Sequence, residues 1–141
     1  MISAKKKDLG STFKKIYKLK GRKKIALLFQ KGIKLHVHPF KVLYIIESKN
    51  VDDLEPCFQW GIAVMKRNIK KAVHRNRIKR LFFEAFRFHK NEINAFLQQH
   101  QLHLTIFFIY LDKEENNLLY YQQKVKEILT LLYEKISLLD K

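Results

Sequence analysis

Residues 66–90 read KRNIKKAVHRNRIKRLFFEAFRFHK, a stretch in which basic and apolar side chains follow one fixed pattern. Its first fifteen residues hold eight lysines and arginines and no acid. Apolar residues recur at helical spacing and would form the core-facing side: Ile78, Leu81, Phe82, Ala85 and Phe86. Four other residues fall on the opposite side: Asn76, Arg80, Phe83 and Arg87. The pattern predicts a helix with one apolar and one cationic face, with Asn68 placed to cap its start.

The charge of this stretch indicates what the helix is for. Glu84 is the lone acid among ten basic residues in 66–90. A helix face that serves only solubility usually mixes both signs, whereas like charges repel one another unless a polyanion neutralises them. Asparagine and arginine side chains also offer hydrogen-bond donors that suit phosphate oxygens. A solvated helix face is the alternative, but the pattern favours contact with nucleic acid.

The composition of the whole chain supports a polyanionic partner. The chain has 141 residues and a formal net charge of +16, and twelve of its basic residues lie in residues 5–34, with ten more in residues 66–90. Such concentrated charge indicates nucleic acid first and an anionic membrane surface second. Cys57 is the only cysteine, which excludes an internal disulfide framework. The basic start and the lack of a long apolar run predict a cytoplasmic protein.

The remaining chain predicts a single α+β domain at residues 18–141, preceded by a basic arm at residues 1–17. Ile25, Leu28 and Phe29 mark a helix between Gly21 and Gly32. Alternating apolar residues predict strands at 36–48 and 58–64, joined as a hairpin. Residues 102–111 are apolar on both faces, as in a central strand reached through a crossover, and 117–139 form an amphipathic helix. The predicted order is α-β-β-α-β-α, with a small, mostly antiparallel sheet packed by helices.

The sequence offers no protein-borne catalytic site. It contains no Ser-His-Asp arrangement, no HExxH motif and no glycine-rich phosphate loop. His36 and His38 are spaced to share a strand face but lack a third metal ligand. Asp52, Asp53 and Glu55 are more typical of a solvent-facing turn than of a cation site. We therefore predict neither catalytic residues nor a metal site on the protein.

The segment AVHRNRIKRLFFEAFR (Ala72 to Arg87) resembles the signature of the bacterial ribonuclease P protein component, which joins an R-N-R core to I-K-R-L and E-A-F-R. KKIALLFQKG, FKVLYI and WGIAVMKRN extend the resemblance over residues 18–110. Two positions depart from the family pattern: Met65 replaces a common serine, and Phe83 replaces the usual arginine. Phe83 would either stack on an RNA base or pack on another part of this chain.

This resemblance implies a function and a set of site residues. It implies a left-handed βαβ crossover that displays the R-N-R helix, in the protein subunit of an endoribonuclease whose RNA subunit holds Mg²⁺ and performs the hydrolysis. The protein would bind that catalytic RNA and the 5′ leader of precursor tRNA, with no membrane and no obligate protein partner. The residues implied for binding the RNA subunit are Lys66, Arg67, Lys70, Lys71, Arg75, Asn76, Arg77, Lys79, Arg80 and Arg87. The residues implied for the leader, in a groove between the first helix and the sheet, are Ile25, Phe29 and Tyr44.

Two other functions fit the same charge pattern. A ribosomal protein would use similar electrostatics to bind RNA without a role in processing. A helix-turn-helix DNA-binding protein requires a short helix before its recognition helix, but the strand-like CFQWGIAVM occupies that place. The sequence therefore favours an RNA-binding protein.

Overall fold

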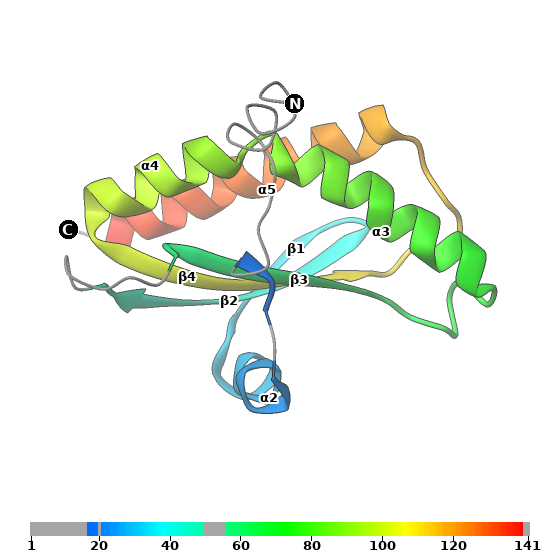
Figure 1. Cartoon of the computed structure of the whole chain (residues 1–141), viewed down its shortest axis with the longest axis horizontal. Coiled ribbons are helices and arrows are strands. Elements are labelled where there is room, and N and C mark those ends of the chain that lie inside the picture. The colour runs from blue at the N-terminus through cyan, green and yellow to red at the C-terminus, as the bar shows by residue number, and fades with distance from the viewer. Residues whose placement is uncertain (1–16, 20, 50–55, 140–141) are drawn as a thin grey trace, which may run out of the picture.

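A computed structural model describes residues 17–19, 21–49 and 56–139, which form one four-stranded sheet with helices on both faces (Figure 1). The predicted acidic loop and most of the predicted basic arm lie outside these residues. The elements in chain order are α2 (Arg22–Lys31), β1 (Ile33–Val37), β2 (Phe40–Ser48), β3 (Phe58–Val64), α3 (Ala72–Arg87), α4 (Lys90–His100), β4 (Leu102–Tyr110) and α5 (Leu118–Leu139). The predicted α+β class is confirmed.

The strand order is β1-β2-β4-β3, which corrects two expectations. The strand predicted at 36–48 is divided into β1 and β2 by a turn at His38–Pro39, and these two strands form the antiparallel hairpin. The hairpin predicted between 36–48 and 58–64 is wrong, because β4 lies between β2 and β3. β4 pairs antiparallel with β2 and parallel with β3. Its side chains are apolar on both faces, so the central position buries more of them than an edge would.

The two faces of the sheet carry separate cores. α3, α4 and α5 cover one face and α2 covers the other (Figure 1). The larger core, under α3–α5, includes Phe40, Val42 and Tyr44 of β2. The smaller core, under α2, includes Leu28, Leu43 and Phe107. Alternate residues of β2 therefore point to opposite cores, as the period of two predicts.

Glycines fix both ends of α2, as predicted. Gly21 precedes the helix with φ of 95°, in the left-handed region that favours glycine. Gly32 follows the helix, and its backbone N–H donates to Leu28 O at 2.8 Å. A Cβ at Gly32 would lie 2.3 Å from that same oxygen, so a larger residue would force the backbone to move.

Residues 17–19 join the two faces along the outer edge of β3. Lys18 forms a parallel bridge with Trp60, and Leu19 N donates to Trp60 O at 2.9 Å. The ring of Tyr17 lies 4.9 Å from that of Phe58 on the α3–α5 side, whereas Leu19 belongs to the core under α2. This short segment therefore covers part of an edge strand that would otherwise expose backbone hydrogen-bonding groups.

Buried tyrosines hold the connection between β4 and α5. Tyr121 Oη donates to Tyr110 Oη at 3.3 Å, and Tyr110 Oη donates to the Glu114 carbonyl at 2.6 Å. Asn116 contributes its side-chain Nδ2 to Tyr110 Oη at 2.8 Å and its backbone N–H to Tyr121 Oη at 3.0 Å. Burial raises the pKa of both hydroxyls. Residues 111–117 are thus held by groups that stay neutral in the folded protein.

We predict that alkaline unfolding will coincide with ionisation of four tyrosines, of which three are buried and Tyr133 is half-buried. Burial raises the pKa of Tyr44, Tyr110, Tyr121 and Tyr133 above the value for the unfolded chain. Their contribution to stability is therefore complete below about pH 10 and is lost as the pH rises further. Tyrosinate absorbance and far-ultraviolet circular dichroism should change together in one alkaline transition. Titration of these four side chains near pH 10 with the fold intact would contradict the prediction.

Candidate nucleic-acid interface

The orientation of α3 follows from its apolar face. Ile78, Phe82, Ala85 and Phe86 are buried, as predicted. The ring of Phe86 lies 4.7 Å from that of Trp60 on β3, and the ring of Phe82 lies 4.7 Å from that of Phe108 on β4. With this side fixed on the sheet, the opposite side of α3 faces solvent.

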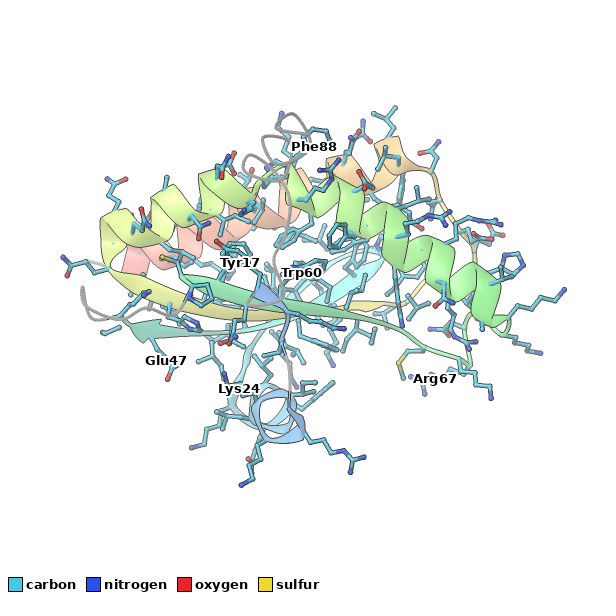
Figure 2. All side chains as sticks on the ribbon, viewed as in Figure 1. Tyr17, Lys24, Glu47, Trp60, Arg67 and Phe88 are labelled. Atoms are coloured by element: carbon cyan, nitrogen blue, oxygen red, sulfur yellow. The ribbon has the colours of Figure 1, made fainter. Side chains whose placement is uncertain are left out.

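The exposed side of α3 and the turn before it form a cationic surface, which we call the basic ridge. Its members are the exposed residues Lys66, Arg67, Lys70, Lys71, Asn76, Lys79 and Arg80. α3 begins with no acidic residue in its first turn. The positive partial charge of the helix N-terminus therefore adds to that of the neighbouring lysines and favours an anion there. Figure 2 shows Arg67 at this end of α3.

Asn68 does not cap α3, which corrects an expectation. The helix begins at Ala72, and Lys71 occupies the N-cap position. The backbone N–H groups of Asn68 and Ile69 both donate to Met65 O at 3.0 Å, forming a turn at the end of β3. Residues 66–70 thus belong to this turn and not to the helix.

Arg75, the first arginine of the R-N-R motif, stabilises that turn. Its Nη1 donates to Ile69 O at 2.9 Å and to Lys70 O at 2.7 Å. A guanidinium that satisfies two carbonyls fixes the backbone from which Lys70 and Lys71 project. Arg75 therefore has a structural task in addition to the RNA contact predicted for it.

Arg77, the second arginine, faces an acidic group from a distant part of the chain. Its Nη1 lies 3.2 Å from Glu115 Oε1, and His74 Nδ1 lies 2.6 Å from Glu115 Oε2. Glu115 belongs to the segment held by Tyr110 and Tyr121. One carboxylate thus neutralises part of the charge on the first turns of α3, with His74 contributing an ion pair when it is protonated.

Phe83 and Arg87 differ from a simple helical-wheel prediction. Phe83 is half-buried and packs against the larger core, with its ring 6.0 Å from that of Trp60. The prediction that it points away from the core is wrong, because the Trp60 ring neighbours Phe83 as well as Phe82 and Phe86. Packing within this chain, the alternative to RNA stacking, is what the structure shows. Arg87 is half-buried, and its Nε donates to Glu84 at 3.0 Å.

The face covered by α2 carries a second candidate region. Phe29 is 52% exposed, and its ring lies 6.1 Å from that of Phe107. Ile25 is partly buried against the core under α2. Tyr44 lies on the other face of the sheet and is only 1% exposed, so the prediction that it lines this groove is wrong. The alternation of β2 places Tyr44 with Phe40 and Val42, away from α2.

A groove of about 450 Å³ lies beside α2 on this face. Its lining combines apolar, basic, acidic and hydroxyl side chains from α2, β2 and β4: Lys24, Leu27, Ile45, Glu47, Ser48, His103 and Thr105. Lys24 Nζ also donates to Gln59 Oε1 of β3 at 3.2 Å. Figure 2 shows Lys24 and Glu47 on the α2 side of the sheet. The mixture suits a ligand with both charged and planar apolar parts.

Sequence reasoning missed several residues of these two regions. The two-sided apolar pattern of residues 102–111 is a signal that could have identified Phe107 as a partner for Phe29. In the sequence, Lys24 is distinguished only as one of the twelve basic residues in residues 5–34. No local signal places Glu115 beside α3, because the contact depends on how the β4–α5 connection folds back.

Neither a membrane span nor a metal cluster is found among residues 17–19, 21–49 and 56–139. No helix there is long and apolar enough to cross a membrane. No three side chains of His, Cys, Asp or Glu in that part gather to hold one ion. Cys57 is buried, and burial raises the pKa of its thiol, which favours the less nucleophilic protonated form.

Comparisons with known proteins agree on one family. A family model described as Ribonuclease P matches residues 13–134. Proteins described as ribonuclease P protein component from Porphyromonas gingivalis and Chlorobium phaeobacteroides are each 33% identical to this chain, over 93 and 92 residues. The first alignment covers 66% of both chains; the second covers 62% of this chain and 63% of its relative.

Solved structures give the same result. The Staphylococcus aureus RNase P protein superimposes with a TM-score of 0.60 at 25% identity, covering 82% of this chain and 94% of that one. The Thermotoga maritima RNase P protein, in complex with 1-(4-fluorophenyl)-2-thiourea, has a TM-score of 0.60 at 27% identity. That alignment covers 79% of this chain and 96% of the other.

We predict that Arg75→Ala will lower the free energy of unfolding by about 1–2 kcal/mol, because two carbonyls of the 66–70 turn lose a charged donor. Arg80→Ala, which removes an exposed arginine from the same helix, should change it by less than about 0.5 kcal/mol. Urea denaturation of both variants and the wild type measures the difference. Equal stability of the two variants would show that Arg75 does not hold the turn.

Proposed function

The chain belongs to the ribonuclease P protein family, and on this premise we propose that it binds the catalytic RNA of ribonuclease P and the 5′ leader of precursor tRNA. The observation that carries the proposal is the basic ridge, a set of outward-facing cations on α3 and on the turn before it, where the rotation of α3 is fixed by an aromatic core. The proposed location is the cytoplasm, where its proposed substrate is made.

The basic ridge is suited to phosphate groups of a folded RNA. Its cations lie on a rigid helix and an anchored turn, so they need little reordering on binding. Each phosphate neutralised by a lysine or arginine releases condensed counterions, which makes affinity depend steeply on salt. With six to ten such contacts, affinity should fall roughly 10³- to 10⁵-fold between about 50 and 200 mM salt.

The groove beside α2 is the proposed site for the single-stranded leader. Lys24 in the groove lining offers an ammonium group for a phosphate. Phe29, which lies on α2 outside that lining, offers an exposed ring to a neighbouring part of the leader. Stacking of one base on an aromatic side chain contributes about 1–3 kcal/mol without requiring a particular base. Such a surface would hold leaders of different sequence, as a general processing enzyme requires.

The proposed division of labour leaves hydrolysis to the RNA subunit. That RNA would hold the Mg²⁺ ions that activate water for cleavage of the phosphodiester. The protein's contribution would be electrostatic: two polyanions, the catalytic RNA and the precursor, repel each other, and the cations of α3 and α2 lower that repulsion. The protein would therefore matter most where little Mg²⁺ is available to screen the phosphates.

We predict that this protein will stimulate 5′ cleavage of precursor tRNA by the catalytic RNA at low Mg²⁺, and less so at high Mg²⁺. The double variant Lys79→Gln/Arg80→Gln should weaken RNA binding and reduce the salt slope by about two, one for each lost phosphate contact. Cleavage rates and filter-binding titrations at several salt concentrations measure these effects.

The matched control is Lys126→Gln/Lys135→Gln, which removes two exposed charges from α5. It should bind RNA nearly as well as the wild type. If the wild type left cleavage unchanged at every Mg²⁺ concentration while still binding RNA, a structural RNA-binding role would replace the proposed one.

We predict that Glu115→Gln will increase affinity for the RNA subunit. The carboxylate that pairs with Arg77 competes with phosphate for the guanidinium, so its neutralisation should free Arg77 and steepen the salt slope by about one. Glu127→Gln, which removes the same charge from an ion pair with Lys124 on α5, is the control. A loss of affinity in Glu115→Gln would instead show that Glu115 orients Arg77 for binding.

A further inference from the structure

Phe88 exposes an aromatic ring at the end of α3. It lies directly after the last helical residue, and its side chain is 65% exposed. Its backbone angles, φ −58° and ψ −28°, continue the helical path for one more residue. Figure 2 shows Phe88 and Arg67 at opposite ends of α3. The C-terminal end of this helix therefore exposes a phenyl ring.

A charged group accompanies this ring. The Arg87 guanidinium carbon lies 6.0 Å from the centre of the Phe88 ring, at the outer limit of a cation–π contact. Glu84 holds the same guanidinium through a 3.0 Å contact to Arg87 Nε. A planar cation is thus kept next to an exposed aromatic face.

The position of Phe88 on the helix relates it to Arg77 and to Arg80, the second of which belongs to the basic ridge. Eleven residues separate it from Arg77, which is about three helical turns, so the two project from nearly the same side. Eight residues separate it from Arg80, which is about 12 Å along the axis and about 80° around it. A few nucleotides of one RNA strand span such a distance, so a strand whose phosphates contact Arg80 would bring a base near Phe88.

Single exposed apolar residues are common on protein surfaces and by themselves indicate nothing. Here the surroundings select one ligand class. A ligand that fits must carry negative charge for the ridge and a flat π face for the ring, and a nucleotide with an unpaired base has both. We propose that Phe88, flanked by Arg87, is a stacking site for an unpaired base of the RNA bound by α3; this inference rests on the proposed function.

Phe83 cannot take this role in the observed arrangement. Its ring packs on Trp60 and is half-buried, whereas Phe88, five residues later, leaves most of its surface open. Phe88 and Phe29 are the two phenylalanines that are more than a third exposed in the part of the chain that the structure describes. They lie on opposite sides of the sheet, so the two rings serve different segments of RNA.

The first test compares Phe88→Ala with the wild type in RNA binding. Loss of one stacked base should weaken affinity roughly 5- to 150-fold. The salt slope should stay unchanged, because stacking releases no counterions. Leu138→Ala, which truncates a 70% exposed side chain near the end of α5, is the matched control and should bind as the wild type does. The melting temperatures of both variants should equal that of the wild type.

Two RNA arms identify the source of the base. The catalytic RNA alone and the precursor tRNA alone are titrated separately against each variant. A defect of Phe88→Ala confined to the first RNA places the base in the ribozyme, and a defect confined to the second places it in the precursor. Affinity within twofold of the wild type for both RNAs would overturn the proposal.

A gain of signal provides an independent readout. Phe88→Trp should keep wild-type affinity, and its exposed indole should be quenched when RNA binds; the native Trp60 is only 7% exposed. Unchanged fluorescence of Phe88→Trp at saturating RNA would overturn the proposal. A lower melting temperature of Phe88→Ala that accounts for its weaker RNA binding would also overturn it. If the wild type bound neither RNA, the proposed function itself would be refuted. If the wild type bound RNA and Phe88→Ala bound it with the same affinity, only this inference would be refuted.

Discussion

The packing of Phe82 and Phe86 against Phe108 and Trp60 determines which way every cation of α3 points. The ring separations of 4.7 Å for both Phe82–Phe108 and Phe86–Trp60 leave little freedom for rotation of the helix. Turning α3 by one residue would rotate it by about 100° and move charged side chains toward the sheet. Burial of an unpaired charge costs several kcal/mol, so the aromatic contacts and the cationic face select the same orientation. Binding chemistry on the outside is therefore specified by packing on the inside.

The three residues of the R-N-R motif make different contacts in the structure. Arg75 binds the carbonyls of Ile69 and Lys70, Arg77 faces Glu115, and Asn76 is exposed between them. Only part of the motif's charge is thus presented directly to a ligand. The rest holds the turn in place or is balanced by the β4–α5 connection. A motif matched as a string of letters gives these residues equal weight, whereas their contacts assign them different tasks.

The sequence predicted those features that depend on local periodicity. The apolar face of α3, the two-sided burial of β4 and the glycines around α2 each follow from spacing along a few turns or pleats. The errors arise where distant segments decide. The proposed hairpin of residues 36–48 with 58–64 failed because β4, some forty residues later, takes the place between them. Phe83 lies on the polar side of an ideal helical wheel, but Trp60 reaches it from β3. Tyr44 was assigned to the groove by resemblance, although its alternation with Phe40 and Val42 already indicated the opposite face.

The two proposed RNA sites are linked through β3 and its outer edge. Lys24 of the α2 groove contacts Gln59, and the neighbouring Trp60 supports α3 from the other face. Residues 17–19 pair with this same strand and reach both cores, so α2 and α3 are attached to one short, well-supported segment. Two sites held in fixed relation act on one ligand with a high effective concentration. A precursor engaged at the groove would therefore be presented to RNA on the ridge without the entropy loss of a second independent encounter. Under the proposed function, this fixed geometry is how the protein would promote a reaction performed by its RNA partner.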